Sequence, residues 1–279
     1  MDALATQPVS IEKVSAGARL RQDDRVAVEE PLEIRIRRAG DEGADQPISV
    51  TMRTPGHDAE LVLGFLYSEG VISDWREVRR VRHCGASGNV VRVDLRADVR
   101  FDPARFERHF CITSSCGLCG KTSTGTITSQ VRVRRVEATW RVDVPVLHEL
   151  PARLRAAQGA FAATGGLHAV GLFDRTGHLG AIYEDVGRHN ALDKLVGARL
   201  AADALPLADS LLLLSGRASF ELVQKAAAAG VPLVAAIGAP SSLAVDLARD
   251  AGMTLVAFLR DGAFNVYAHG ERVCTGAMV

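Results

Sequence analysis

The pattern of apolar and polar positions in residues 26–110 predicts a small α/β subdomain. Residues 26–38 alternate apolar and charged side chains, as in a half-buried strand, and residues 48–53 and 90–95 have the same character. Between them, residues 58–70 carry leucines at largely helical spacing, with Asp58 as the predicted N-cap and Gly70 as the stop. Residues 1–25 are polar and show no period, so we expect them to form a mobile arm.

The pattern from residue 131 to residue 279 predicts a larger α/β core. Leu147, Leu150, Leu154 and Phe161 mark a helix, which two strands follow at 168–173 and 179–185. Apolar runs at 211–214, 233–237 and 254–259 then alternate with helices expected at 190–200, 219–229 and 242–251, and an edge strand is expected at 263–268. This order predicts a largely parallel sheet covered on both faces, that is, a three-layer α/β sandwich.

Composition and charge narrow the class of function. The 279 residues contain 33 Lys and Arg and 33 Asp and Glu, so the chain lacks the overall positive charge typical of nucleic-acid binding. No apolar run is long enough to span a membrane, and the first residues lack the features of a secretory signal. We therefore expect a cytoplasmic protein with no nucleic-acid or membrane partner. Five cysteines, an odd number, favour reduced thiols with a chemical role over a disulfide framework.

Two of these thiols, Cys116 and Cys119, lie three residues apart in a loop expected over residues 111–130. Glycines and hydroxyl side chains surround them without any apolar period, which predicts a solvent-accessible segment. Lys121 places a cation beside them, and a nearby cation lowers the pKa of a thiol. The pattern predicts a reactive thiolate at this pair.

Two turns between strand and helix are candidates for anion binding. Gly216, Arg217 and Ser219 follow the strand at 211–214, and Gly238, Ser241 and Ser242 follow the strand at 233–237. Helix N-termini carry unpaired N–H groups and a positive dipole end, and ligands of open α/β sheets collect where such turns lie. The pair suits a pyrophosphate or a nucleotide, whereas the plainer interpretation is two tight connections.

Residues 183–194 form a third polar cluster, YEDVGRHNALDK, at the end of a predicted strand. Arg188 and His189 are its candidate ligand-binding residues. In the alternative interpretation, Asp185 or Asn190 are helix caps, and Asp193 and Lys194 belong to a solvated helix face. The segment Arg260-Asp261-Gly262 ends the last parallel strand, on the same rim as the two turns.

Other chemistries of a cysteine pair fit the sequence less well. A structural zinc site needs four ligands, and neither Cys84 with His83 nor Cys111 with His109 supplies a second CxxC spacing. Zinc deaminases need an upstream HxE, which this chain lacks. Residues 122–126, after the pair, are poor helix formers and lead into a strand-like segment at 131–136, unlike a thioredoxin dithiol. A sulfur carrier fits best, with dithiol exchange as the alternative.

Five segments resemble the formate dehydrogenase accessory sulfurtransferase family, FdhD. They are SSCGLCGKTS, RTPGHDAELVLGFLYSEGVI, YEDVGRHNALDK, LLSGRASFELVQKAAAAGVPLVAAIGAPSSLAV and FLRDGAFNVYA. The resemblance implies a cytidine-deaminase-like core. It also implies that sulfur passes from a cysteine desulfurase to the molybdenum cofactor, bis-molybdopterin guanine dinucleotide, before this cofactor enters formate dehydrogenase.

The same resemblance implies roles for individual residues. Cys116 would carry the persulfide and Cys119 would support or relay it, while no metal would be bound directly by the protein. The two turns would meet the phosphates of the guanine nucleotide portion at Ser219 and Ser242, and the family suggests a homodimer. The cofactor would also contact Phe258, Leu259, Arg260, Asp261, Gly262 and Ala263. A cofactor-binding chaperone without catalytic cysteines remains the alternative function.

Overall fold

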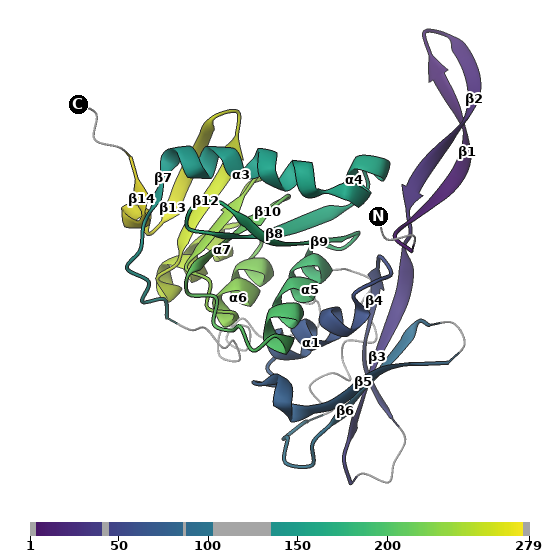
Figure 1. Ribbon diagram of the computed structural model, residues 1–279, viewed down its shortest axis with the longest axis vertical. Helices are drawn as coiled ribbons and strands as arrows, with labels where there is room; N and C mark the ends of the chain where they lie inside the picture. The colour runs from purple at the N-terminus through teal and green to yellow at the C-terminus, as the bar shows by residue number, and fades with distance from the viewer. Residues whose placement is uncertain (1–3, 41–44, 86–87, 103–134, 276–279) are drawn as a thin grey trace.

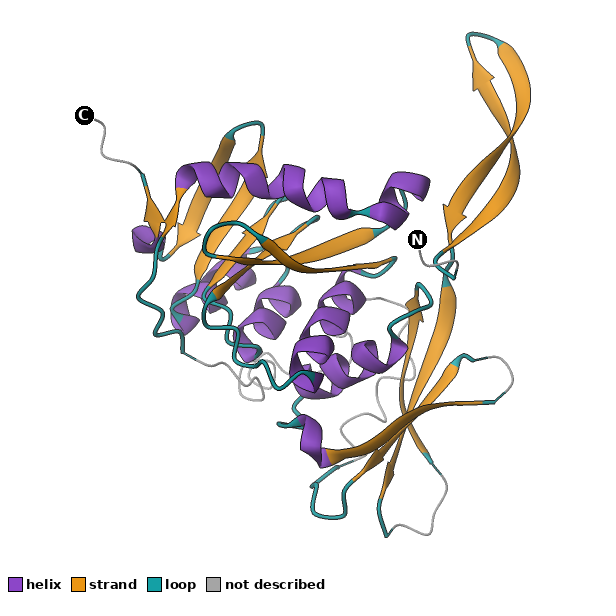
Figure 2. Cartoon of the chain, in the orientation of Figure 1, coloured by secondary structure: helices purple, strands orange, loops and turns teal. Residues whose placement is uncertain are grey.

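The computed structural model describes residues 4–40, 45–85, 88–102 and 135–275 of the chain. It is a mixed α/β protein with several sheets (Figures 1 and 2). The largest sheet has the strand order β13-β12-β11-β10-β8-β9. Its strands are β8 (His168–Asp174), β9 (Leu179–Asp185), β10 (Ser210–Leu214), β11 (Leu233–Ala236), β12 (Thr254–Arg260) and β13 (Ala263–Ala268).

The prediction of a largely parallel sheet was wrong. Within this six-stranded sheet only β10, β11 and β12 pair in parallel, whereas β8 pairs antiparallel with both β9 and β10, and β13 pairs antiparallel with β12. Short turns join β8 to β9 and β12 to β13, and a strand that returns through a short turn must pair antiparallel with its neighbour. Strand β13 does lie at an edge, as expected.

Helices cover both faces of this sheet, which gives three layers (Figure 1). In β8, Ala169 and Phe173 belong to one hydrophobic cluster, and Val170 and Leu172 belong to the other, because successive side chains of a strand point to opposite faces. Helices α3 (Val144–Ala157) and α4 (Gly159–Thr164) cover the first face. Helices α5 (Arg188–Ala201), α6 (Phe220–Ala228) and α7 (Ser242–Ala251) cover the second. The single helix predicted around 147–161 is therefore two, which meet at the buried Gln158.

The N-terminal part forms a four-stranded sheet in the order β4-β3-β6-β5. Its strands are β3 (Glu30–Arg38), β4 (Gln46–Arg53), β5 (Val78–Cys84) and β6 (Val90–Leu95), with helix α1 (Asp58–Ser68) and a short 3-10 turn (Trp75–Glu77) between β4 and β5. The sequence did not predict β5, because its residues VRRVRHC show little apolar alternation. Two short strands, β7 (Val142–Asp143) and β14 (Val273–Cys274), pair in parallel, and a 3-10 turn (Gly270–Arg272) precedes β14.

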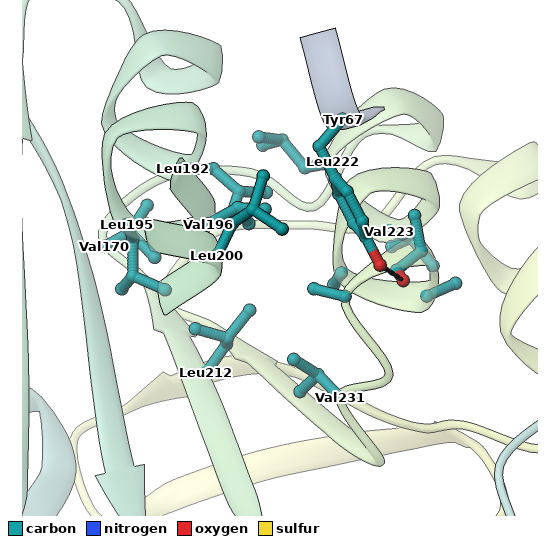
Figure 3. Packing of buried hydrophobic residues seen from close by; sticks show 14 of the residues in the cluster. Tyr67, Val170, Leu192, Leu195, Val196, Leu200, Leu212, Leu222, Val223 and Val231 are labelled. Carbon is teal, nitrogen blue, oxygen red and sulfur yellow. Dashed lines mark hydrogen bonds between the residues drawn. The ribbon is translucent and has the colours of Figure 1, made fainter. Parts of the chain in front are cut away.

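The N-terminal sheet and the core share one hydrophobic cluster. Apolar side chains of β3, β6 and α1 belong to the same buried cluster as those of α5, α6 and β10. Figure 3 shows Tyr67, from the end of α1, among Leu222 and Val223 of α6, where its hydroxyl donates a hydrogen bond to the carbonyl of Ala228 at 3.0 Å. The two parts therefore exclude water together instead of folding around separate cores.

Residues 1–25, for which the sequence predicts a mobile arm, include two strands that the sequence did not mark. Strands β1 (Thr6–Ser15) and β2 (Ala18–Ala27) form an antiparallel hairpin around Ala16 and Gly17, both of which have positive φ. This hairpin projects from the rest of the molecule (Figure 1), and its side chains are mostly exposed. Because neither face is buried against a core, the sequence carries no apolar alternation that would have marked the strands.

Buried polar contacts join the N-terminal sheet to the core. The Asp185 carboxylate, at the end of β9, accepts a hydrogen bond from the backbone N–H of Thr54 at 3.2 Å and lies 2.7 Å from the Lys194 ammonium of α5. Lys194 in turn donates to the carbonyl of Thr54 at 2.9 Å. One residue of the β4–α1 connection is thus held on both its donor and its acceptor side by a buried ion pair.

Two sequence interpretations of this region need correction. Asp193 and Lys194 do not belong to a solvated helix face, since both are buried, and Asp193 pairs with Lys225 of α6 at 2.7 Å. Asp58 is not the N-cap of α1. His57 occupies that position with a left-handed backbone, and the Asp58 carboxylate receives two hydrogen bonds of 3.0 Å from Arg53. The Asp58 carboxylate at the start of α1 therefore forms a buried ion pair with Arg53 instead of capping a free backbone N–H.

Helices α1 and α5 touch through their backbones. A Cβ atom at Gly64 would lie 1.9 Å from the carbonyl oxygen of Asp193, and one at Gly197 would lie 1.8 Å from that of Glu60. Both contacts are far shorter than a van der Waals distance, so each position admits only glycine at this separation of the helices.

We expect Gly64→Ala or Gly197→Ala to lower the free energy of unfolding by about 3 kcal/mol, because the added methyl group must push two backbones apart. The measurement is urea unfolding followed by circular dichroism. Gly180→Ala is the matched control, since its Cβ would meet nothing closer than 3.7 Å, and we expect it to change stability by less than about 1 kcal/mol. Equal stability of all three variants would show that the helices separate without cost.

Candidate functional site

The polar segments singled out in the sequence meet at one end of the six-stranded sheet, where strands β9, β10, β11 and β12 finish. This end of the sheet is here called the polar edge. Asp185 at the end of β9 pairs with His168 at the start of β8, and Leu214 at the end of β10 pairs with Ala236 at the end of β11. Strand β12 runs parallel to β11, so Arg260 also ends at this edge. The shared rim expected for the two turns and the Arg260 segment is confirmed by this topology.

The two candidate anion turns are bonded to each other. The N–H of Gly238 donates to the carbonyl of Gly216 at 2.9 Å, the N–H of Ala218 donates to that of Ala239 at 3.1 Å, and the N–H of Ser241 donates to that of Ala218 at 3.0 Å. The turns pack closely at Gly238, because a Cβ there would lie 3.0 Å from the carbonyl oxygen of Gly216 and would require a small shift of that backbone. These three amides hold the turns side by side, so they are not available to a ligand.

The serines at the helix starts differ in what they bind. Ser241 is the N-cap of α7 and accepts a hydrogen bond from the N–H of Ala244 at 3.3 Å, which leaves Ser242 as the first helical residue. Ser219 is the N-cap of α6 but makes no side-chain cap. Its hydroxyl lies 3.5 Å from Nε2 of His189. The structure thus brings the predicted residues His189 and Ser219 together on the α5–α6 side of the polar edge.

His168, a histidine that the sequence did not single out, lies at this edge, at the start of β8. Burial lowers the pKa of His168 from its usual value; the charges of Arg188 and Arg217 also lower it, against the opposing effect of Asp185. Arg188 and Arg217 therefore act on the same imidazole, which is held in its neutral form. Within the described parts of the chain neither arginine has an ion pair, and Nε of Arg188 is buried without a hydrogen-bond partner.

A cavity of about 600 Å³ opens at the polar edge on the side of α3 and α4. His168, Ser215 and Ile237 line it from the sheet, while Arg155 and Phe161 line it from the helices, with the guanidinium 4.1 Å from the centre of the Phe161 ring. The volume lies in the range of ligand pockets. The sequence did not mark either residue as a ligand contact: its pattern predicts Phe161 only as an apolar position of an amphipathic helix, and it did not single out Arg155.

A family model described as the FdhD/NarQ family matches residues 27–274, nearly the whole chain. The chain belongs to the FdhD/NarQ family.

Relatives of this family member support the assignment. The sulfur carrier protein FdhD of Streptomyces coelicolor is 46% identical over 289 aligned residues, which cover 98% of each chain. That of Mycobacterium tuberculosis is 45% identical over 279 residues, covering 96% of this chain and 99% of the relative. A crystal structure titled as a putative formate dehydrogenase accessory protein from Desulfotalea psychrophila shares the fold, with a TM-score of 0.74 and 24% identity over 97% of this chain and 100% of that one.

The predicted thiol site of this family member, Cys116, Cys119 and Lys121, lies outside the described residues. In the parts that are described, no three His, Cys, Asp or Glu side chains gather into a group that would hold a metal ion. No helix of these parts has both the length and the apolar character needed to cross a membrane.

The segment 258–263 approaches the second turn, since the N–H of Phe258 donates to the carbonyl of Gly238 at 3.2 Å. Phe258, Asp261 and Gly262 have positive φ, and such a backbone at a residue with a side chain costs about 1–2 kcal/mol. Leu259 is 1% exposed and packs in the core, so its side chain does not reach the polar edge. Arg260, Asp261 and Ala263 are exposed.

We expect the lowered pKa of His168 to make the protein less stable in acid, because the folded protein disfavours the protonated imidazole. Because the folded pKa of His168 is lowered, its contribution is complete above the unfolded pKa of about 6.5 and is lost as the pH falls toward the folded pKa. Urea unfolding between pH 7.5 and 5.5 should show His168→Gln losing less stability than wild type, by up to about 1.4 kcal/mol per pH unit. His178→Gln, at an exposed histidine, serves as the control. If His168→Gln lost as much stability as wild type between pH 7.5 and 5.5, the lowered pKa of His168 would be refuted.

Proposed function

We propose that this protein is a sulfur carrier, a sulfurtransferase that takes sulfur from a cysteine desulfurase as a persulfide on Cys116. The observation that carries the proposal is the 46% identity over 98% of the chain to a protein named sulfur carrier protein FdhD. The CxxC pair of Cys116 and Cys119 beside Lys121 supplies the sulfur chemistry that such a role requires.

Loading is a transfer of one sulfane sulfur between thiols. The Cys116 thiolate attacks the terminal sulfur of the desulfurase persulfide, forms Cys116–S–SH, and releases the desulfurase cysteine as its thiolate. No net oxidation occurs, because the S–S bond that forms replaces the one that breaks. Lys121 favours the thiolate of Cys116 at neutral pH by its positive charge.

Delivery as sulfide needs two electrons, and the second thiol of the motif supplies them. The Cys119 thiolate attacks Sγ of Cys116, the inner sulfur of its persulfide, forms the Cys116–Cys119 disulfide, and releases hydrosulfide. The oxidised protein then needs a thiol reductant before it can be loaded again. In this scheme Cys119 is the resolving thiol.

The sulfur acceptor we propose is the molybdenum cofactor, bis-molybdopterin guanine dinucleotide, whose metal centre would take sulfide as a ligand before insertion into formate dehydrogenase. The polar edge suits its phosphates, because Arg188 and Arg217 have no ion pair in the described residues and Nε of Arg188 is buried without a partner. A guanidinium is a strong bidentate partner for phosphate. Ser219, whose hydroxyl does not cap its own helix, is a further donor.

The same proposal includes the finer points that the resemblance implies. The core is proposed to be cytidine-deaminase-like, which its three layers and mixed sheet support. Segment 258–263 is proposed to contact the cofactor, which its strained backbone beside the second turn supports. We also propose a cytoplasmic homodimer with a cysteine desulfurase and formate dehydrogenase as partners.

The proposal is tested by the intact mass of the protein after incubation with a cysteine desulfurase and cysteine. We expect wild type to gain one sulfur that a thiol reductant removes, and Cys116→Ala to gain none. Cys119→Ala should gain the sulfur and retain it longer, because it lacks the resolving thiol. Cys84→Ala is the control, since Cys84 lies on β5, away from the CxxC motif in the sequence, and should load as wild type does.

No gain of sulfur in any variant, with the desulfurase shown to be active, would refute the persulfide step. The cofactor-binding chaperone would then be the better description, and Arg188 and Arg217 would matter for function while the cysteines would not. Bound zinc in stoichiometric amount, with unfolding by a chelator, would instead assign the cysteine pair to a structural metal site.

A further inference from the structure

The outer face of the N-terminal sheet concentrates arginines in a chain with no net charge. Arg35 of β3 pairs with Arg92 of β6, and Arg92 pairs with Arg82 of β5, so three like charges lie directly opposite one another across three strands. Like charges opposite each other destabilise a sheet. In this sheet the carboxylates of Glu33, Asp45 and Asp94 offset that repulsion through ion pairs with the three arginines.

A groove of about 420 Å³, here called the arginine groove, lies on this sheet. Its lining contains five arginines and one carboxylate: Arg37, Arg38, Arg79, Arg80 and Arg92, with Asp94, beside Ala39 and Gly40. A second cavity of about 600 Å³ shares Ala39 and Arg79 with it. The two cavities therefore adjoin at these two residues.

A β-bulge in β5 helps to build the arginine groove. The register shifts between Val78 and Arg80, which leaves Arg79 as an extra residue, and both Arg79 and Arg80 line the groove. In a regular strand two consecutive side chains point to opposite faces, and a bulge redirects one of them. Both arginines are exposed, and neither has an ion pair in the parts of the chain that the structure describes.

Asp45 shows which chemistry the arginine groove accepts. Nη1 of Arg92 lies 3.3 Å from each carboxylate oxygen of Asp45, and Nε of Arg37 lies 3.7 Å from the same carboxylate. Arg79 and Arg80 lack such a partner and present their guanidinium groups to solvent beside this pair. A carboxylate from another molecule would find the same kind of bidentate partner there.

We propose that the arginine groove is a docking surface for a carboxylate-rich segment of a protein partner. A nucleic acid fits less well, because no aromatic side chain lines the groove for base stacking, and the carboxylates of Asp45 and Asp94 would repel a regular row of phosphates. The groove lies on a different sheet from the polar edge. This proposal does not depend on the sulfur chemistry.

The test measures binding of a fluorescein-labelled peptide of about ten alternating glutamate and serine residues by fluorescence anisotropy at low and high salt. We expect binding that weakens with salt and that falls at least about tenfold in Arg79→Glu/Arg80→Glu and in the milder Arg79→Gln/Arg80→Gln. The control is Arg19→Glu/Arg21→Glu on the exposed hairpin, which should stay within about threefold of wild type.

In the binding measurements, the proposal would be overturned by equal affinity of the Arg79/Arg80 variants and wild type, by an equal loss in the hairpin control, or by equal affinity and the same arginine dependence for an oligothymidylate of similar length. Hydrogen exchange of the full protein with the peptide bound localises the site. We expect slower exchange in residues 37–40 and 78–82, whereas protection only around Arg188, Arg217 and Arg260 would place the peptide at the polar edge and refute the proposal.

Discussion

The buried ion pair of Asp185 and Lys194 is the interaction on which the arrangement of this protein depends. Removing a carboxylate and an ammonium from water is costly unless each finds its partners, and here each finds several. Asp185 accepts from the backbone N–H groups of Thr54 and Gly187 and from the Asn190 side chain, at 2.8–3.2 Å. Lys194 donates to the carbonyl of Thr54 at 2.9 Å. The pair therefore fixes the β4–α1 connection against the β9–α5 connection.

This constraint also shapes the polar edge. Asp185 pairs with His168 across the β8–β9 ladder, so the residue that holds the N-terminal sheet also lies opposite a histidine that lines the cavity of the candidate site. Arg188 follows three residues later, at the start of α5, with its Nε buried and unpartnered in the described structure. One short motif thus holds both a structural residue and a candidate binding residue. The buried Asp185 ends β9, and Arg188 starts α5 at the polar edge.

Much of the fold was predictable because the core strands are apolar and the turns are rich in glycine and serine. Residues 90–95, 179–185 and 242–251 form β6, β9 and α7 as expected. Strand direction was not predictable, since a buried antiparallel strand such as β8 is as apolar as a parallel one. The burial of Lys194 was also hidden, because one of its hydrogen-bond acceptors, the carbonyl of Thr54, is 140 residues away in the sequence and lies beside the ammonium only after folding.

The candidate site was predictable in part, because its two turns are rich in glycine and serine. The turns after β10 and β11 had a clear signal, and they do lie side by side. His168 stands alone at the start of a strand, and Arg155 and Phe161 belong to helices on the opposite face of the sheet from α5 and α6. Only the assembled sheet brings these three residues to one cavity. Cys116 and Cys119 lie outside the described residues, so their place relative to this edge stays a prediction.

A double-mutant cycle on Asp185 and Lys194 tests the central claim most directly. Urea unfolding should show Asp185→Asn and Lys194→Met each losing about 3–5 kcal/mol, because each leaves a buried charge without its counter-ion, while the double variant loses less than the sum. Hydrogen exchange should show faster opening of residues 58–68 in the single variants. Single losses below about 1 kcal/mol, with α1 protected as in wild type, would contradict the claim that this pair holds the two parts together.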